Sequence, residues 1–247
     1  MEHIRKTLNV FDEMGKYWAE IADQNQTERQ ISFIKSILKP KGLVLDLACG
    51  TGRHLIALGK ECYHVVGLDV STKLLSIAKG RENNAEVIRA DMRFLPFKSN
   101  AFSAIMSMDT SFGYLPTIQD DLQSLKELHS TLPRGGILTV DVFNREHQIK
   151  LHETKDQPRR REYPSFFLFQ KRTVTQDGGE LHYEWTIRDK KDGQFRVFEH
   201  AVRLYRLEEL RDLLENAGFN VNSVYGDYEF QEFSSDSNRL IVVAMAK

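Results

Sequence analysis

Cysteine is scarce in this sequence, and proline is not abundant either. The 247 residues include two cysteines, Cys49 and Cys62, and six prolines. Two cysteines are too few for a disulfide framework, and their spacing to neighbouring histidines is not that of a metal site, so we interpret both as small apolar residues in a reducing compartment. With few prolines and 41% hydrophobic residues, the chain is neither collagenous nor disordered. We expect an ordinary globular protein without a metal.

A strong charge of one sign is also missing. The chain has 34 lysines and arginines against 35 aspartates and glutamates, a net charge of -1. No global basic field would attract nucleic acid or an anionic membrane, which favours a small or neutral partner. The longest apolar run, residues 240–246, is far shorter than a bilayer-spanning segment, and the opening MEHIRK is not an apolar signal core. We therefore predict a cytoplasmic protein without a membrane segment.

Short apolar runs alternate with helical segments through the middle of the chain. Residues 11–38 have helical spacing that ends at Pro40-Lys41-Gly42, so residues 1–40 are predicted as an N-terminal helical cap. The pattern then predicts strands over 42–50, 64–70, 86–90, 104–108 and 137–142, and helices over 53–62, 72–82 and 119–132. Such alternation is typical of a doubly wound α/β core, with a mostly parallel sheet covered on both faces. We assign residues 41–144 and 207–247 to this core.

The alternation stops after Asn144. Strand-like segments over 166–175, 180–189 and 194–205 are separated by Asp177-Gly178-Gly179 and Asp192-Gly193, which are hairpin signals. Residues 145–206 carry 14 lysines and arginines and 10 aspartates and glutamates, whereas the rest of the chain carries 20 and 25. These residues are therefore predicted to form an inserted small antiparallel β-sheet. A helix ending at Gly218 and strands over 220–228 and 239–247 complete the core.

The segment that carries most information is DLACGTG, residues 46–52. Glycines at the end of the first strand let a ligand approach the backbone, and the following helix N-terminus attracts an anionic group. Asp69 closes the second strand 17 positions after Gly52, where a carboxylate can accept hydrogen bonds from ribose hydroxyls. The alternative is that Asp69 caps the next helix. A dinucleotide fingerprint would need glycine at position 55, where this chain has Leu55, so the pattern predicts a nucleoside site and disfavours NAD.

Three motifs in order resemble those of the class I S-adenosylmethionine-dependent methyltransferases: VLDLACGTGRH, GLDVS and ADMRFLPF. The likeness extends over nearly the whole chain, with Ala48 in the first glycine position of the family's D-x-G-x-G-x-G. It implies S-adenosylmethionine as cofactor and S-adenosylhomocysteine as product. It also implies a Rossmann-like seven-stranded sheet whose C-terminal strands add an antiparallel hairpin at the sheet edge.

The resemblance also implies roles for individual residues. Gly50 and Gly52 would line the methionine portion of the cofactor, Asp69 would bind the ribose, and Val70 would cover the adenine. Alternatives stay open for three positions: Asp91 as a plain loop residue, Asp46 as a support for the glycine loop, and Tyr17, with its neighbour Trp18, as core packing instead of a cap over the cofactor. The implied cofactor-binding set is Tyr17, Asp46, Ala48, Gly50, Gly52, Asp69, Val70, Asp91, Met92 and Met108.

The end of the fourth strand, residues 108–114, would face the transferable methyl group. It contains neither the Asn/Asp-Pro-Pro-Tyr/Phe sequence of base-amine methyltransferases nor a nucleophilic cysteine, and SFGYL resembles small-molecule methyltransferases, including those for amino sugars and glycine-like amines. A small-molecule acceptor methylated on nitrogen or oxygen is expected, with the small sheet covering it. Candidates for a base or orienting group are Asp109, Tyr114, His200 and Tyr205. His200 would alternatively be a half-buried sheet histidine.

Two other functional hypotheses remain: an RNA methyltransferase and a noncatalytic module that binds the cofactor. Arg159-Arg160-Arg161 has no surrounding aromatic-basic repeat and is predicted as a solvated loop, which does not favour nucleic acid. Arg53 and His54, at the start of the first core helix, are predicted to face solvent or pack. The exposed strand edges of the insert would allow a homo-oligomer.

Overall fold

The computed structural model describes residues 2–22, 24–38, 42–154 and 159–247. In this part of the chain seven strands form one sheet in the order β10-β11-β5-β4-β1-β2-β3. The strands are β1 (Leu43–Leu47), β2 (His64–Asp69), β3 (Glu86–Arg89), β4 (Ala104–Ser107), β5 (Ile137–Phe143), β10 (Phe219–Tyr225) and β11 (Arg239–Ala246). β11 is antiparallel to both β5 and β10, and the other neighbours are parallel. The predicted fold class is confirmed, with the antiparallel strand second from the edge.

Helices cover both faces of the large sheet because successive strand residues point to opposite faces. On one face, α2 (Gln24–Ile37) and α3 (Arg53–Lys60) pack against side chains such as Val44 and Met106. On the other face, α5 (Ile118–Thr131) and α7 (Leu207–Asn216) pack against side chains such as Leu45 and Ile105. α4 (Thr72–Arg81) follows β2 and contacts β2 and β3. This arrangement gathers the carboxyl ends of β1, β2 and β4 at one edge.

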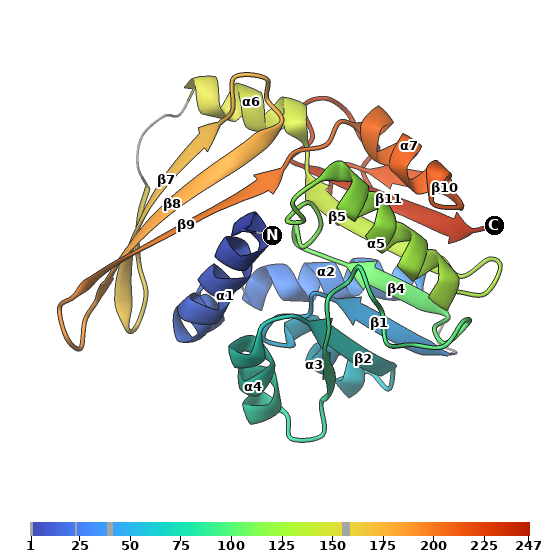
Figure 1. The fold of residues 1–247 in the computed structure, drawn as a ribbon, viewed down its shortest axis with the longest axis horizontal. Coiled ribbons are helices and arrows are strands. Elements are labelled where there is room, and N and C mark those ends of the chain that lie inside the picture. The colour runs from blue at the N-terminus through green and yellow to red at the C-terminus, as the bar shows by residue number, and fades with distance from the viewer. Residues whose placement is uncertain (1, 23, 39–41, 155–158) are drawn as a thin grey trace.

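A second, four-stranded antiparallel sheet stands apart from the large one (Figure 1). It follows α6 (Arg145–Thr154) and consists of β6 (Arg159–Glu162), β7 (Phe166–Val174), β8 (Glu180–Asp189) and β9 (Phe195–Arg203). The loop predicted for Arg159–Arg161 is wrong, because these residues form β6 and pair with β7, with Arg160 opposite Phe169. The run RRRE has no apolar alternation, so a strand there could not be recognised. α6, which is equally polar, was also not predicted.

Helix α1 (Glu2–Ile21) lies between the small sheet and the core (Figure 1). Its Tyr17 packs edge-on against Phe166 of β7, and the Tyr17 hydroxyl donates to Asp189 Oδ2 at 2.7 Å. Toward the core, Asp12 accepts hydrogen bonds from the Ser71 hydroxyl and, at 3.1 Å, from the amide of Lys73 at the start of α4. α1 therefore joins the two sheets. No helix in the described part of the chain is both long and apolar enough to cross a membrane.

Gly67, in the middle of β2, offers a test of how tightly the glycine loop packs on the sheet. A Cβ added to Gly67 would lie 2.7 Å from Cys49 Sγ and 3.3 Å from Val87. We expect Gly67→Ala to lower the free energy of unfolding by about 1–3 kcal/mol, the range for overpacking a core. Gly80→Ala is the matched control, since Gly80 is helical with no atom within 4 Å of an added Cβ, and should stabilise by about 0.5–1 kcal/mol. Equal urea midpoints for the two variants would contradict this packing.

Candidate active site

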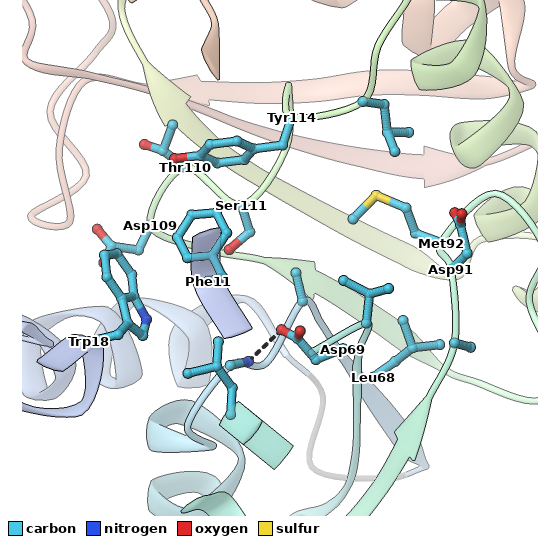
Figure 2. Close-up of a pocket in the computed structure, with 16 residues that line it drawn as sticks. Phe11, Trp18, Leu68, Asp69, Asp91, Met92, Asp109, Thr110, Ser111 and Tyr114 are labelled. Carbon is cyan, nitrogen blue, oxygen red and sulfur yellow. Dashed lines mark hydrogen bonds between the residues drawn. The ribbon is translucent and has the colours of Figure 1, made fainter. Parts of the chain in front are cut away.

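A pocket opens at the carboxyl ends of β1, β2 and β4 and extends under α1. Such an edge is where open α/β sheets bind ligands. The lining residues are Phe11, Trp18, Ala48, Gly50, Leu68, Asp69, Val70, Leu74, Ala90, Asp91, Met92, Asp109, Thr110, Ser111, Tyr114 and Leu115. Figure 2 shows Asp109, Tyr114, Phe11 and Trp18 toward one end and Asp91 and Met92 at the other, with Asp69 between them. The end that holds Asp109 and the three aromatic rings is called the acidic aromatic end. The pocket thus extends from this end to the carboxyl ends of β2 and β3.

The loop after β1 turns sharply where it meets the pocket. Ala48, Gly50 and Gly52 have φ values of 55°, 54° and 74°, all in the left-handed region. Gly52 caps the N-terminus of α3, and an added Cβ would lie 3.0 Å from Ala78 Cβ. Gly52 therefore serves helix packing and does not line the pocket, whereas Ala48 and Gly50 do. Ala48 has the same left-handed backbone without being glycine, which costs about 1–2 kcal/mol.

Asp69 holds the glycine loop and the start of α4 together. Its Oδ2 accepts the Gly50 amide and its Oδ1 accepts the Ser71 amide, each at 2.8 Å. Ser71 itself is the N-cap of α4, because its hydroxyl accepts the Leu74 amide, so the N-cap alternative for Asp69 is wrong. Burial raises the pKa of Asp69, and the amide hydrogen bonds oppose that shift. A carboxylate has about four acceptor positions, so two amides leave capacity toward the pocket.

Val70, Asp91 and Met92 line the far end of the pocket. Burial acts to raise the pKa of Asp91, but the Arg93 side chain and amide outweigh it, and that pKa is lowered. The Arg93 guanidinium contacts both Asp91 oxygens, at 3.0 Å and 2.6 Å, and also Asp120 at 2.9 Å. Asp91 is therefore ionised and fixed in place after β3.

Asp109 sits in a strained turn at the acidic aromatic end. Asp109 and Thr110 have φ values of 56° and 62°, an unusual pair of left-handed residues without glycine. Asp141 of β5 holds this turn: its Oδ2 accepts the Asp109 amide at 2.8 Å, and its carbonyl accepts the Thr110 amide at 2.9 Å. Arg53 donates to Asp109 Oδ2 at 2.7 Å. Of the two roles expected for Arg53, facing solvent or packing, the first is excluded, since its side chain is only 14% exposed; it pairs with Asp109.

A buried hydrogen-bond network supports the turn from behind. Arg239 of β11 donates to Asp141 Oδ1 at 2.7 Å and to the Thr110 hydroxyl at 2.9 Å. The Tyr228 hydroxyl donates to Asp141 Oδ2 at 2.7 Å and accepts from Gln30 at 2.8 Å. Gln30 Oε1 in turn accepts from Arg53, at 2.6 Å, which closes a ring back to Asp109. Sequence reasoning missed Gln30, Asp141, Tyr228 and Arg239, although a charged residue in each of the apolar strands β5 and β11 was a usable signal.

Three aromatic rings complete this end of the pocket. The Phe11 ring centroid lies 5.3 Å from Trp18 and 5.4 Å from Tyr114, at interplanar angles of 79° and 87°. Burial raises the pKa of Tyr114 far above neutrality, so its hydroxyl stays protonated. Trp18 also covers the glycine loop, with Nε1 3.8 Å from the position of a Gly50 Cβ.

Several candidate residues lie outside the lining. Tyr17 faces the small sheet, as described, and Met108 packs among α2 and α3. Asp46 is buried, which raises its pKa to about 7, and it accepts the Leu55 amide of α3 at 3.1 Å. The Tyr205 hydroxyl donates to Asp121 at 2.6 Å. These residues stand behind the pocket wall, not in it.

His200 also lies one layer behind the pocket. Its ring stacks on Tyr183 with centroids 4.7 Å apart and lies 5.6 Å from Phe11, and its Nδ1 is buried without a hydrogen-bond partner among the described residues. Burial lowers the pKa of His200 to about 4. The ring is therefore neutral at pH 7.

His200 predicts a pH dependence of stability. An unfolded histidine has a pKa near 6.5. Between that pH and about 4, the unfolded state therefore binds more protons than the folded state. The contribution of neutral His200 to the free energy of unfolding is fully present above this pH range and is lost as the pH falls through it. From pH 7 to pH 4.5 the wild type should lose about 2 kcal/mol more than His200→Phe. His54, whose pKa burial also lowers, is common to both proteins. Parallel profiles of unfolding free energy against pH would contradict this.

Comparison with known proteins finds similarity to methyltransferases. A family model described as a methyltransferase domain matches residues 44–136. The chain is 26% identical over 246 residues to "Putative methyltransferase YqeM" of Bacillus subtilis (strain 168), covering 95% of this chain and 96% of that protein. It is 27% identical over 240 residues to glycine/sarcosine N-methyltransferase of Parasynechococcus marenigrum (strain WH8102), covering 92% and 83%. The solved CcbJ methyltransferase from Streptomyces caelestis shares the fold, with a TM-score of 0.82, 16% identity and coverage of 96% and 97%.

Proposed function

We propose that the chain, which is a class I S-adenosylmethionine-dependent methyltransferase, methylates a nitrogen or oxygen atom of a small-molecule acceptor bound beside Asp109. One observation carries this proposal: a single pocket connects Gly50 and Asp69, the nucleoside end, to Asp109 and Tyr114. The similarity to a glycine/sarcosine N-methyltransferase over most of both chains supports a small acceptor. We also expect the protein to act in the cytoplasm.

The residues at the nucleoside end fit the cofactor. The left-handed Gly50 leaves its backbone open to a ligand, and the buried Asp69 carboxylate retains acceptor positions suited to ribose hydroxyls. We propose that Ala48 and Gly50 contact the methionine portion, Asp69 the ribose, and Val70 with Asp91 and Met92 the adenine. S-adenosylmethionine would supply an electrophilic methyl group.

Four candidate residues would act on this site from behind. Gly52 and Asp46 position the start of α3, the latter through the Leu55 amide. Tyr17 anchors α1 to the small sheet, and Met108 packs into the core just before the turn at Asp109. We propose that they shape the pocket without touching the ligand.

At the acceptor end, the side chains of this protein would mainly position the acceptor and exclude water. Arg53 binds one oxygen of Asp109, a residue of the pocket lining, and leaves the other without a hydrogen bond from the described residues. The protonated Tyr114 hydroxyl can donate a hydrogen bond. Correct placement of the acceptor supplies most of the rate gain in a direct displacement. We propose Asp109 and Tyr114 as the groups that contact the acceptor, with His200 supporting the Tyr114 and Phe11 rings from behind.

The proposed domain division assigns a supporting role to the insert. Every pocket-lining residue comes from α1 or from the core, and none from residues 145–206 in their described part. We propose that the cap, residues 1–40, closes the pocket through Phe11 and Trp18. The insert would cover the acceptor site indirectly, by holding α1. A homo-oligomer through the insert remains a prediction that sedimentation velocity tests.

An RNA acceptor is a second candidate because of one surface feature. The Arg160 guanidinium lies 5.0 Å from the Phe167 ring centroid and 5.9 Å from that of Phe169, an exposed basic and aromatic group of the kind that binds single strands. Phe167 alternates with the buried Phe166 and Leu168, which face α1, so this group is on the sheet face away from the pocket. Its placement favours the small-molecule proposal.

Methyl transfer from labelled S-adenosylmethionine tests the proposal directly. Small amines, amino sugars, alcohols and total tRNA would be offered separately to the full chain. We expect label in at least one small molecule and none in tRNA. Label in tRNA alone, with retention that falls steeply with salt, would support the RNA candidate. Tight cofactor binding with no labelled product from any acceptor would support a noncatalytic module.

A further inference from the structure

We propose that the acceptor end of the pocket binds an organic ammonium group, so that the acceptor is an amine and not an alcohol. The bound ammonium would release one proton to solvent before its nitrogen attacks the methyl group, because only the neutral amine has a lone pair. This inference rests on the proposed function and narrows its substrate class. Phe11, Trp18 and Tyr114 present aromatic rings to the pocket, and Asp109 supplies a carboxylate beside them (Figure 2). A cation near aromatic faces is attracted by their negative electrostatic potential.

The three rings form a corner and not a stack. Phe11 is nearly perpendicular to both Trp18 and Tyr114, so the rings enclose space from different directions. A second layer fixes them: Trp18 stacks on Trp185 at a centroid distance of 5.8 Å, and Tyr114 lies 6.1 Å from His200. Rings that are already ordered lose little entropy when a ligand binds.

The charges of the lining favour a cation. Among the described residues, its ionisable side chains include three carboxylates, Asp69, Asp91 and Asp109, and no lysine, arginine or histidine. Asp69 is occupied by two amides and Asp91 by the Arg93 guanidinium.

Asp109 is the carboxylate best placed to meet a ligand. Its side chain is 38% exposed, against 29% for Asp91. Arg53 binds Oδ2, and among the described residues no hydrogen bond reaches Oδ1. Arg53 partly neutralises the carboxylate, so the charge alone is a weak attractor. A carboxylate oxygen that accepts no hydrogen bond from the described residues, combined with three aromatic rings in the lining, selects a cation over a neutral group of equal size.

A pair of probes that differ only in charge tests the inference on the wild type. Choline and 3,3-dimethyl-1-butanol have nearly the same shape, and only choline is a cation. Each would be titrated calorimetrically into the full chain saturated with S-adenosylhomocysteine, which lacks the sulfonium charge of the cofactor. We expect choline to bind at least tenfold more tightly. Equal affinities would overturn the inference and leave the methyltransferase proposal standing, whereas failure to bind S-adenosylhomocysteine would defeat the proposed function.

Single substitutions identify the residues that cause the preference for choline over its neutral analogue. Asp109→Asn and Phe11→Leu should each weaken choline binding at least fivefold, while affinity for S-adenosylhomocysteine changes less than twofold. Tyr114→Phe keeps the ring and should retain choline binding. Asp212→Asn is the matched control, because Asp212 is an exposed residue of α7 outside the pocket lining. Unchanged choline affinity in both Asp109→Asn and Phe11→Leu would overturn the assignment.

Discussion

Replacing Asp69 with alanine is expected to weaken S-adenosylhomocysteine binding by about 1–3 kcal/mol, the cost of losing hydrogen bonds to a charged acceptor. The variant would lose both the proposed ribose contact and the bond that holds the Gly50 amide. Calorimetric titration of the variant and the wild type measures the difference, and near-ultraviolet circular dichroism checks that the variant remains folded.

Ser71→Ala separates this role from a structural one. It removes the N-cap of α4 and the hydroxyl that contacts Asp12, but it leaves the Asp69 carboxylate in place. We expect it to lower stability by about 0.5–2 kcal/mol, with a much smaller loss of cofactor affinity than Asp69→Ala. A folded Asp69→Ala variant that binds as tightly as the wild type would mean that Asp69 does not contact the cofactor.

Arg239→Met should have the largest effect on stability, a loss of about 3–5 kcal/mol, because it leaves the buried Asp141 carboxylate without its charged partner. Arg239 is 4% exposed and Asp141 is fully buried, with Nε and Oδ1 2.7 Å apart. Burial raises the pKa of Asp141, while Arg239 opposes that shift. Urea unfolding measures the loss, and an unchanged m-value would show that the unfolded state is unaffected.

Two further variants make this prediction specific. Arg134→Met removes an exposed arginine of the α5–β5 loop and should change stability by no more than about 0.5 kcal/mol. Adding Asp141→Leu to Arg239→Met should recover part of the loss, because no uncompensated charge remains. If Arg239→Met were as stable as Arg134→Met, the buried pair would not stabilise the fold.

Local patterns were sufficient to predict most of the core because β1, β2, β4, β5 and β11 are buried over most of their length and have apolar sequences. The same periodicity failed at β6, whose RRRE sequence is extended only because β7 pairs with it. It also failed at α6, a polar helix without a continuous apolar face from which a helix could be predicted. Both elements depend on tertiary contacts that a sequence window does not contain.

Some residues of the candidate site could likewise be predicted from local sequence, and others could not. Ala48, Gly50 and Asp69 belong to motifs that are contiguous in sequence, and all three line the pocket. The support of Asp109 depends on Gln30, Arg53, Asp141, Tyr228 and Arg239, which come from five separate segments. No local rule predicts that these side chains meet. The left-handed turn at Asp109 likewise separates Met108, in the core, from Asp109, in the pocket.

Calorimetric titration of the wild-type chain with S-adenosylhomocysteine and, separately, with NAD tests the central claim most directly. Both ligands contain adenosine, but Leu55 is buried in the core packing where a dinucleotide fingerprint has glycine. The account predicts saturable binding of S-adenosylhomocysteine at one site per chain and no heat of binding from NAD. Tight binding of NAD with no response to S-adenosylhomocysteine would contradict it.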